Sequence, residues 1–319
     1  MNRMTVLVFA CGISSGVFAQ EYPTRPVRIV VPFAAGGAAD ISARGISPGL
    51  AEILRQNVII DNRPGAGGTI GAEYVAKATP DGYTLLLGSN STLSVAPSLY
   101  PRIRYNSVRD FFPITLLATT PLVLAIHPSV PAKNIKEFIA IGKAKPKILT
   151  MASGGLGSMN QMTGELFQSL TGVKFIHVPF KGSAPAVVGL ISGEVDMIFD
   201  QLATSITHIN AGKLRALGVT SKTRNLLLPQ VPTMAESGIA NYLVTSITGL
   251  LVPTGTPSGI VDKLNTATLN VLKNDDVKAR FSTAGLEVHG STPQEFSAFI
   301  KDDLSRWTKV VKETNISVE

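Results

Sequence analysis

The chain of 319 residues is poor in cysteine, because Cys11 is its only one. Cys11 lies in an apolar N-terminal stretch that we expect to be removed, which leaves no thiol for a disulfide, a nucleophile or a cysteine metal site. No later segment approaches the roughly 18 uncharged apolar residues that a membrane-spanning helix requires. These absences argue against a disulfide-stapled domain and against a membrane anchor.

The motifs that mark common enzymes are also missing. No H-x-x-x-H or H-E-x-x-H pair is formed by the four histidines, His127, His177, His208 and His289. Residues 65–71 miss the dinucleotide spacing G-x-G-x-x-G by one residue, and no P-loop lysine is present. Gly157-Ser158 lacks the G-x-S-x-G elbow of hydrolases. We therefore expect no cofactor, no metal and no enzymatic activity.

Charge of one sign is not concentrated anywhere in the chain. The net charge is +7, and the lysines and arginines are scattered among acidic residues. This is no nucleic-acid footprint, but it favours anionic ligands slightly. The hydrophobic content of 45% and the length suffice for two compact domains.

The N-terminus has the features of a secretory signal peptide. Arg3 precedes an uncharged apolar run over residues 4–18, and Val17-Phe18-Ala19 has the small residues of a cleavage site. We expect cleavage near Ala19 and a periplasmic mature protein. Cys11 after Val8-Phe9-Ala10 leaves lipidation open as the alternative, although Phe9 fits that motif poorly.

Strand-like and helix-like segments alternate from residue 25 onward. Short β-branched runs at residues 27–33, 57–61 and 83–88 are separated by helical spacing at 41–55 and 69–78. A second set has strands at 148–152, 174–180, 195–200 and 214–220 and helices at 158–170, 184–192 and 204–211. Apolar strands separated by helices are typical of parallel sheets covered on both faces.

Two long extended stretches, residues 114–127 and 241–252, flank the second set. We expect both to cross between two α/β lobes, so that a hinge opens and closes a cleft. The predicted division is a signal peptide over residues 1–19, lobe 1 over 20–121 and 247–319, and lobe 2 over 122–246.

The C-terminal segment is expected to be structural. Thr292 and Glu295 have capping-box spacing before a helix. Its large apolar side chains recur at helical spacing and are predicted to lie in the core: Phe296, Phe299, Ile300, Leu304 and Trp307.

Glycine and serine gather where predicted strands end and helices begin, in segments 32–40, 62–68, 88–92, 153–158 and 179–183, and Asp200-Gln201 stands at the end of another predicted strand. In an open parallel sheet these ends face a ligand crevice. The free amides of a helix start attract an anion, and glycine lets the backbone approach it closely. Four or five such contacts reach micromolar affinity, at about 1.5–3 kcal/mol per charged hydrogen bond and about 8 kcal/mol in total.

Three charged residues in or beside these loops each have two possible interpretations. Asp40 is either a cleft residue or a first-turn acid that complements a helix dipole, and Asp200 is either a cleft residue or a helix cap. Lys181 is either a cleft cation or a solvated turn residue. In the cleft, the two acids would accept hydrogen bonds from a ligand ammonium or hydroxyl group.

From about Tyr22 to its end, the chain resembles the Bug family of extracytoplasmic receptors that serve tripartite tricarboxylate transporters. The order and spacing of several segments carry the resemblance: Pro32-Phe33, Gly36-Gly37, Asp40, residues 62–68, residues 78–84, Gly157-Ser158, Pro179, Lys181-Gly182, residues 212–220, Val231-Pro232-Thr233, Glu236, Pro253 and Thr256-Pro257. The resemblance implies a type II periplasmic binding protein, with two doubly wound α/β lobes joined by two crossover segments.

The resemblance further implies a receptor that binds a small carboxylate in the cleft: a dicarboxylate or tricarboxylate, an acidic amino acid or an aromatic acid. A monomer that delivers its ligand to membrane permease subunits is expected. A sensory input to a histidine-kinase ectodomain, or an enzyme that uses the same cleft, are the alternatives. The expected ligand-binding residues are Phe33, Ala34, Gly36, Gly37, Asp40, Gly67, Gly68, Ser89, Asn90, Ser91, Ser153, Ser158, Gln161, Phe180, Lys181, Gly182 and Asp200.

Two of these positions depart from the family pattern. Gln161 stands where histidine is frequent, and Phe180 stands where tyrosine often precedes Lys-Gly. Gln161 cannot become cationic and Phe180 lacks a hydroxyl group. The sequence therefore predicts the class of ligand but not the individual carboxylate.

Overall fold

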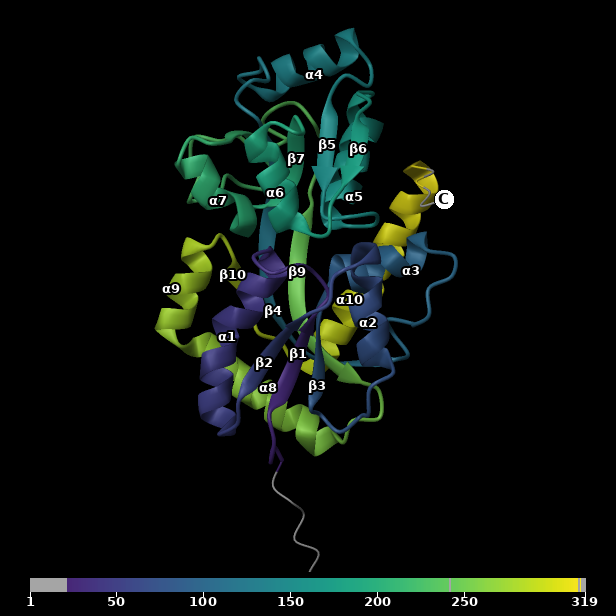
Figure 1. Ribbon diagram of the computed structural model, residues 1–319, viewed down its shortest axis with the longest axis vertical. Helices are drawn as coiled ribbons and strands as arrows, with labels where there is room; N and C mark the ends of the chain where they lie inside the picture. Colours follow the sequence, from purple (N-terminus) through teal and green to yellow (C-terminus); the bar gives the residue numbers. More distant parts are fainter. Residues whose placement is uncertain (1–21, 241, 315, 317–319) are drawn as a thin grey trace, which may run out of the picture.

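The computed structural model describes residues 22–240, 242–314 and 316 (Figure 1). The predicted signal peptide and Cys11 lie outside these residues. The first part of the chain forms β1 (Val27–Val31), α1 (Ala38–Leu54), β2 (Val58–Asn62), the 3₁₀ turn η1 (Ala66–Gly68), α2 (Thr69–Ala76), β3 (Thr84–Ser89), η2 (Ser91–Val95) and α3 (Ala96–Leu99). The middle part forms β4 (Phe111–Ile126), α4 (Ile135–Ala144), β5 (Thr150–Ser153), α5 (Met159–Thr171), β6 (Ile176–Pro179), α6 (Ser183–Ser192), β7 (Met197–Gln201), α7 (Leu202–Asn210) and β8 (Arg215–Val219). The last part forms β9 (Thr245–Pro253), α8 (Ser258–Lys273), α9 (Asp275–Thr283), β10 (Glu287–Val288) and α10 (Pro293–Thr314).

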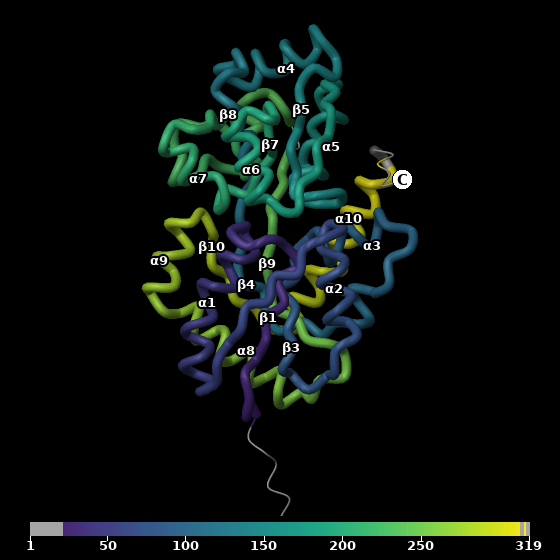
Figure 2. Tube along the Cα trace, viewed as in Figure 1, coloured from purple at the N-terminus to yellow at the C-terminus, as the bar shows by residue number. Residues whose placement is uncertain are grey.

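The strands form one ten-stranded sheet with the order β2-β1-β3-β9-β4-β7-β5-β6, in which β8 and β10 also pair with β4. It contains two parallel groups: β1 lies between β2 and β3, and β5 lies between β6 and β7. Strands β4 and β9 run antiparallel to their neighbours and join the two groups (Figures 1 and 2).

The antiparallel pairs fix which way each parallel group points. Strand β3 is antiparallel to β9 and β9 to β4, so β3 runs in the same direction as β4. Strand β7 is antiparallel to β4 and therefore runs the opposite way. The carboxyl ends of the two parallel groups consequently face each other across the middle of the molecule.

Each parallel group is buried on both faces, as the near-continuous apolar runs predict. Along β1, Ile29 and Val31 pack in one core cluster with α1, α8 and α9, and Val30 packs in another with α2 and α10. The second group is likewise covered by α5 on one face and α6 on the other. The predicted α/β fold with two lobes is confirmed.

Helix α10 buries three of the predicted side chains, those of Phe296, Ile300 and Trp307, whereas Leu304 is only half-buried. Thr292 and Glu295 form the capping box, in which the amide of Glu295 donates to Oγ1 of Thr292 and the amide of Thr292 to the Glu295 carboxylate. Trp307 is buried with 2% of its surface exposed. The prediction that Phe299 is a core residue is wrong, because its side chain is 36% exposed beside the buried stripe of the helix.

Helix α4 and the helical segment η2–α3 are not among the elements that the sequence predicts. Asn134 caps α4 by accepting a hydrogen bond from the amide of Glu137, and Phe138 anchors the helix in the core. Among the described residues, no helix combines the length and the apolar character that crossing a membrane requires.

Candidate functional site

A small cavity, in which the centres of water-sized molecules can occupy about 30 Å³, lies between the facing carboxyl ends of the two parallel groups. The first group contributes the β1–α1 connection and the end of β3, the second group contributes the starts of α5, α6 and α7, and β9 contributes one wall. The lining residues are Phe33, Gly37, Ala38, Ala39, Ser89, Ser91, Gly154, Ser158, Met159, Asn160, Ser183, Gln201, Ser246, Ile247 and Thr248.

Four helices begin at this cavity. The N-caps are Gly37 for α1, Ser158 for α5, Gly182 for α6 and Gln201 for α7. Of these four N-caps only Ser158 caps its helix with a side chain, so the first-turn amides of α1, α6 and α7 have no side-chain acceptor within the described part of the chain. Amides at helix starts have no partner within the helix and carry partial positive charge, so this cavity suits an anion.

None of the described residues that line the cavity carries a charged side chain. The lining offers hydroxyl and amide groups, and one of these lacks a partner. Oγ of Ser89 is buried and makes no hydrogen bond within the described part of the chain. An unsatisfied buried hydroxyl costs about 1–3 kcal/mol, which a bound polar ligand or water would recover.

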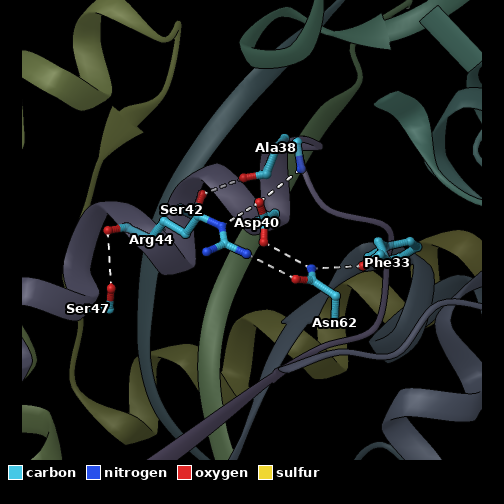
Figure 3. Close-up of polar contacts among 8 residues, drawn as sticks. Phe33, Ala38, Asp40, Ser42, Arg44, Ser47 and Asn62 are labelled. Atoms are coloured by element: carbon cyan, nitrogen blue, oxygen red, sulfur yellow. Dashed lines mark hydrogen bonds and ion pairs between the residues drawn. The ribbon is translucent and has the colours of Figure 1, made fainter. Parts of the chain in front are cut away.

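Asp40 does not line the cavity but holds the loop between β1 and α1, which does (Figure 3). Its carboxylate accepts hydrogen bonds from the amide of Gly36 at 2.9 Å, from Nε of Arg44 at 2.8 Å and from Nδ2 of Asn62 at 2.9 Å. Burial opposes ionisation, but the bonds from Arg44, Gly36 and Asn62 outweigh it and hold the pKa of Asp40 below its ordinary value. Asp40 is thus a first-turn acid that ties the loop before α1 to β2.

Asp200 lies behind the opposite wall and is fully buried. Its carboxyl group accepts a hydrogen bond from Nδ2 of Asn160 at 3.1 Å and another from Oγ of Ser205. Burial raises the pKa of Asp200 to about 7, against the lowering effect of these hydrogen bonds.

Glycines bring the backbones of the two parallel groups together at the edges of the cavity. A Cβ on Gly67 would stand 2.3 Å from the carbonyl oxygen of Leu156, and one on Gly182 would stand 3.1 Å from Cβ of Ala34. Gly36 faces Ala184 in the same way, and Gly68 packs against Phe33. Gly36, Gly67 and Gly182 form contacts between the two groups, whereas Gly68 packs within the first group, and none of the four lines the cavity.

The predicted site residues therefore fall into distinct places. Phe33, Gly37, Ser89, Ser91 and Ser158 line the cavity. The polar groups of four others are engaged within the protein: Asn90 with Asp303 and the amide of Ile247, Ser153 with His177, Gln161 with the amide of Gly157, and Asp200 as above. The ring of Phe180 packs over Gly189, and Lys181 is exposed. Direct ligand contact by any of them stays a prediction.

Several lining residues are absent from the sequence-based set. Ser183 and Gln201 lie in strand-end segments that the sequence marks as candidates, so the signal for them was present. Asn160 stands two residues after Ser158 on the inner side of α5. For Ser246, Ile247 and Thr248 there was no local signal, because only the pairing of β9 with β3 and β4 places them at the cavity.

Comparison with known proteins finds similar sequences and structures over most of the chain. Residues 42–316 match the family model described as tripartite tricarboxylate transporter family receptor. The chain is 37% identical over 315 residues to Protein BugT of Bordetella pertussis (strain Tohama I), covering 98% of this chain and 97% of that relative.

Two solved structures with bound carboxylates are also similar. A protein of R. palustris solved with adipate is 36% identical with a TM-score of 0.90, covering 93% of this chain and 99% of that one. MatC from Rhodopseudomonas palustris with bound malate is 36% identical with a TM-score of 0.88, covering 91% of this chain and all of that one, 100%.

Proposed function

The chain belongs to the tripartite tricarboxylate transporter receptor family, and from that premise we propose that its central cavity captures a small carboxylate for the permease of such a transporter. The proteins solved with adipate and with malate share its fold at 36% identity. They support a dicarboxylate as the ligand of this chain.

The observation that carries the proposal is the meeting of four helix starts at one cavity whose described lining residues carry no charged side chain. Helix-start amides recognise a carboxylate group without a fixed counter-charge. Four or five hydrogen bonds at about 1.5–3 kcal/mol each exceed the roughly 8 kcal/mol of micromolar binding.

We further propose that the two lobes divide at residues 121/122 and 246/247 and close over the ligand. In support, residues 111–121 of β4 pair with β9, whereas residues 122–126 pair with β7 and β8. Two crossings at one level of the sheet favour a hinge there. A ligand that contacts both lobes would stabilise the closed form, which the permease would then recognise.

In this proposal the protein acts outside the cytoplasmic membrane and releases its ligand unchanged. The predicted cleavage near Ala19 and the membership in a receptor family support this assignment. The absence of turnover is part of the proposal and is tested with it.

Thermal unfolding with malate, adipate and adipamide tests the proposal. Adipamide has the shape of adipate but no charge. A ligand at 100 times its dissociation constant stabilises the folded state by about 2.7 kcal/mol, so the Tm should rise with a dicarboxylate and not with adipamide. If neither dicarboxylate raises the Tm, or if the bound acid is consumed over time, the proposal is wrong.

A further inference from the structure

Asn160 is held in one orientation by two backbone partners, of which one can only donate and the other can only accept. Its Oδ1 accepts a hydrogen bond from the amide of Gly154 at 3.1 Å. Its Nδ2 donates to the carbonyl oxygen of Phe199 at 2.8 Å and to the carboxylate of Asp200 at 3.1 Å. A flip of this amide would place donor against donor and acceptor against acceptor. Asn160 is 1% exposed, so its side-chain amide keeps this orientation in the cavity wall.

Gln201 takes its orientation from Asn160 and Ser183. Its Oε1 accepts hydrogen bonds from Oγ of Ser183 at 2.9 Å and from Nδ2 of Asn160 at 3.3 Å. Because Asn160 offers a donor here, the oxygen of the Gln201 amide must face it. The Nε2 group then points away from these partners, and it has no hydrogen-bond acceptor within the described residues. Gln201 is half-buried and lines the cavity, so its two N–H donors are available to a ligand.

The opposite wall also offers a free polar group, the unpartnered hydroxyl of Ser89. The strand register relates the two positions. Ser89 pairs with Thr248, Thr248 pairs with Ala118, and Gln201 pairs with Leu122. Ala118 and Leu122 are four residues apart on β4. The strand positions of Ser89 and Gln201 therefore lie about 13 Å apart along β4.

Among the residues that the structure describes, no acidic side chain is available in this interval. Asp200 is buried with both carboxyl oxygens engaged, and Asp40 is engaged with Gly36, Arg44 and Asn62. An ammonium group on a ligand would thus meet the donors of Gln201 and the helix-start amides without a counter-charge. Such an arrangement selects against an amino group as well as for an oxygen acceptor.

We propose that Gln201 determines the specificity of the cavity, and that its Nε2 group selects a ligand oxygen at the end remote from Ser89 while the cavity rejects amino acids. The inference rests on the proposed function and narrows its ligands to dicarboxylates and hydroxy-dicarboxylates. Asn160 and Ser183 are positioning residues, which act through the orientation of Gln201.

Malate and aspartate provide the test, because they differ only in a hydroxyl or an ammonium group on one carbon. Isothermal titration of the wild-type protein should give at least tenfold tighter binding of malate. Gln201→Glu replaces the donors by an anionic acceptor of the same shape. It should weaken malate binding at least 100-fold and shift the ratio of malate affinity to aspartate affinity toward aspartate. Gln201→Met should weaken malate about tenfold or more.

Gln168→Met is the matched control, because Gln168 lies in the same part of the fold but not in the cavity lining, and both ends of its amide are engaged within the protein. Its Oε1 accepts a hydrogen bond from the amide of Phe175. This variant should lower the Tm without changing the ratio of malate affinity to aspartate affinity. Wild-type binding of aspartate as tight as that of malate overturns the inference, as does malate binding by both folded Gln201 variants within twofold of wild type. A wild type that binds neither malate nor adipate instead overturns the proposed function.

Discussion

The amide of Met159 donates a hydrogen bond to Oγ of Ser91 at 3.1 Å. Ser91 follows the end of β3 and Met159 opens α5, so this bond joins the two parallel strand groups across the cavity. Tyr100 makes a second connection, through its hydroxyl group to the carbonyl oxygen of Leu156 at 2.7 Å. In the proposed receptor such contacts would contribute to closure and so to ligand affinity.

Ser91→Ala should weaken malate or adipate binding roughly three- to tenfold, because one hydrogen bond contributes about 0.5–1.5 kcal/mol. Ser47→Ala is the control, since Oγ of Ser47 bonds only within α1, to the carbonyl oxygen of Arg44. Isothermal titration compares the two variants. Equal affinities for both would show that the Ser91 contact plays no part in closure.

Gly67→Ala should abolish or greatly weaken ligand binding. The new Cβ would stand 2.3 Å from the carbonyl oxygen of Leu156, which forces the two strand groups apart. Gly67 also has a positive φ of 63°, so the substitution adds backbone strain. Gly212→Ala isolates that strain, because Gly212 has a φ of 69° and no atom within 4 Å of the added Cβ.

Both glycine variants should therefore lose a similar amount of stability, about 1 kcal/mol from strain. Only Gly67→Ala should lose affinity for the dicarboxylate. Thermal unfolding without ligand and titration with malate separate the two effects. Full affinity in Gly67→Ala would mean that the approach to Leu156 is not needed for binding.

Asp40→Ala should lower the free energy of unfolding by about 2–4 kcal/mol, because it leaves the donors of Arg44, Asn62 and Gly36 without their acceptor. Since the folded pKa of Asp40 is lowered, its stabilisation is present above the unfolded pKa and is lost as the pH falls through the folded pKa. Urea unfolding at neutral and acidic pH measures this. Exposed Asp262→Ala is the control, and an equal small loss in both variants would contradict the assigned role.

Asp200→Asn should change how stability depends on pH. The pKa of Asp200 is raised from 3.8 to about 7, so in that interval the folded state holds a proton that the unfolded state has released. The contribution of this group therefore becomes less favourable as the pH rises through the interval, and it levels off above about 7. Asparagine has the same shape and does not titrate.

The difference in unfolding free energy between Asp200→Asn and wild type should thus grow in favour of the variant between pH 4 and pH 7, by an amount on the order of a few kcal/mol. Urea unfolding at several pH values measures that difference, in which the other titrating groups cancel. A difference that stays constant with pH would show that Asp200 ionises normally in the folded protein.

Much of this protein was determined locally, by residues close together in the sequence. Apolar strand runs and helical spacing predict the α/β fold, and Thr292 with Glu295 predicts the start of α10. Glycine and serine at strand ends predict where the cavity lies, and Gly37, Ser89 and Ser158 do line it. Helix starts and turns depend on a few neighbouring residues, so their signal is present in the chain itself.

Only the tertiary structure decided which polar groups are free to meet a ligand. Asp40 and Asp200 are acidic residues in or beside the candidate segments, yet distant partners such as Asn62 and Asn160 engage their oxygens. Thr248 reaches the cavity because β9 pairs with β3, more than 150 residues earlier in the chain. Hydrogen-bond partners and strand register depend on contacts between remote segments, and no local pattern of residues encodes those contacts.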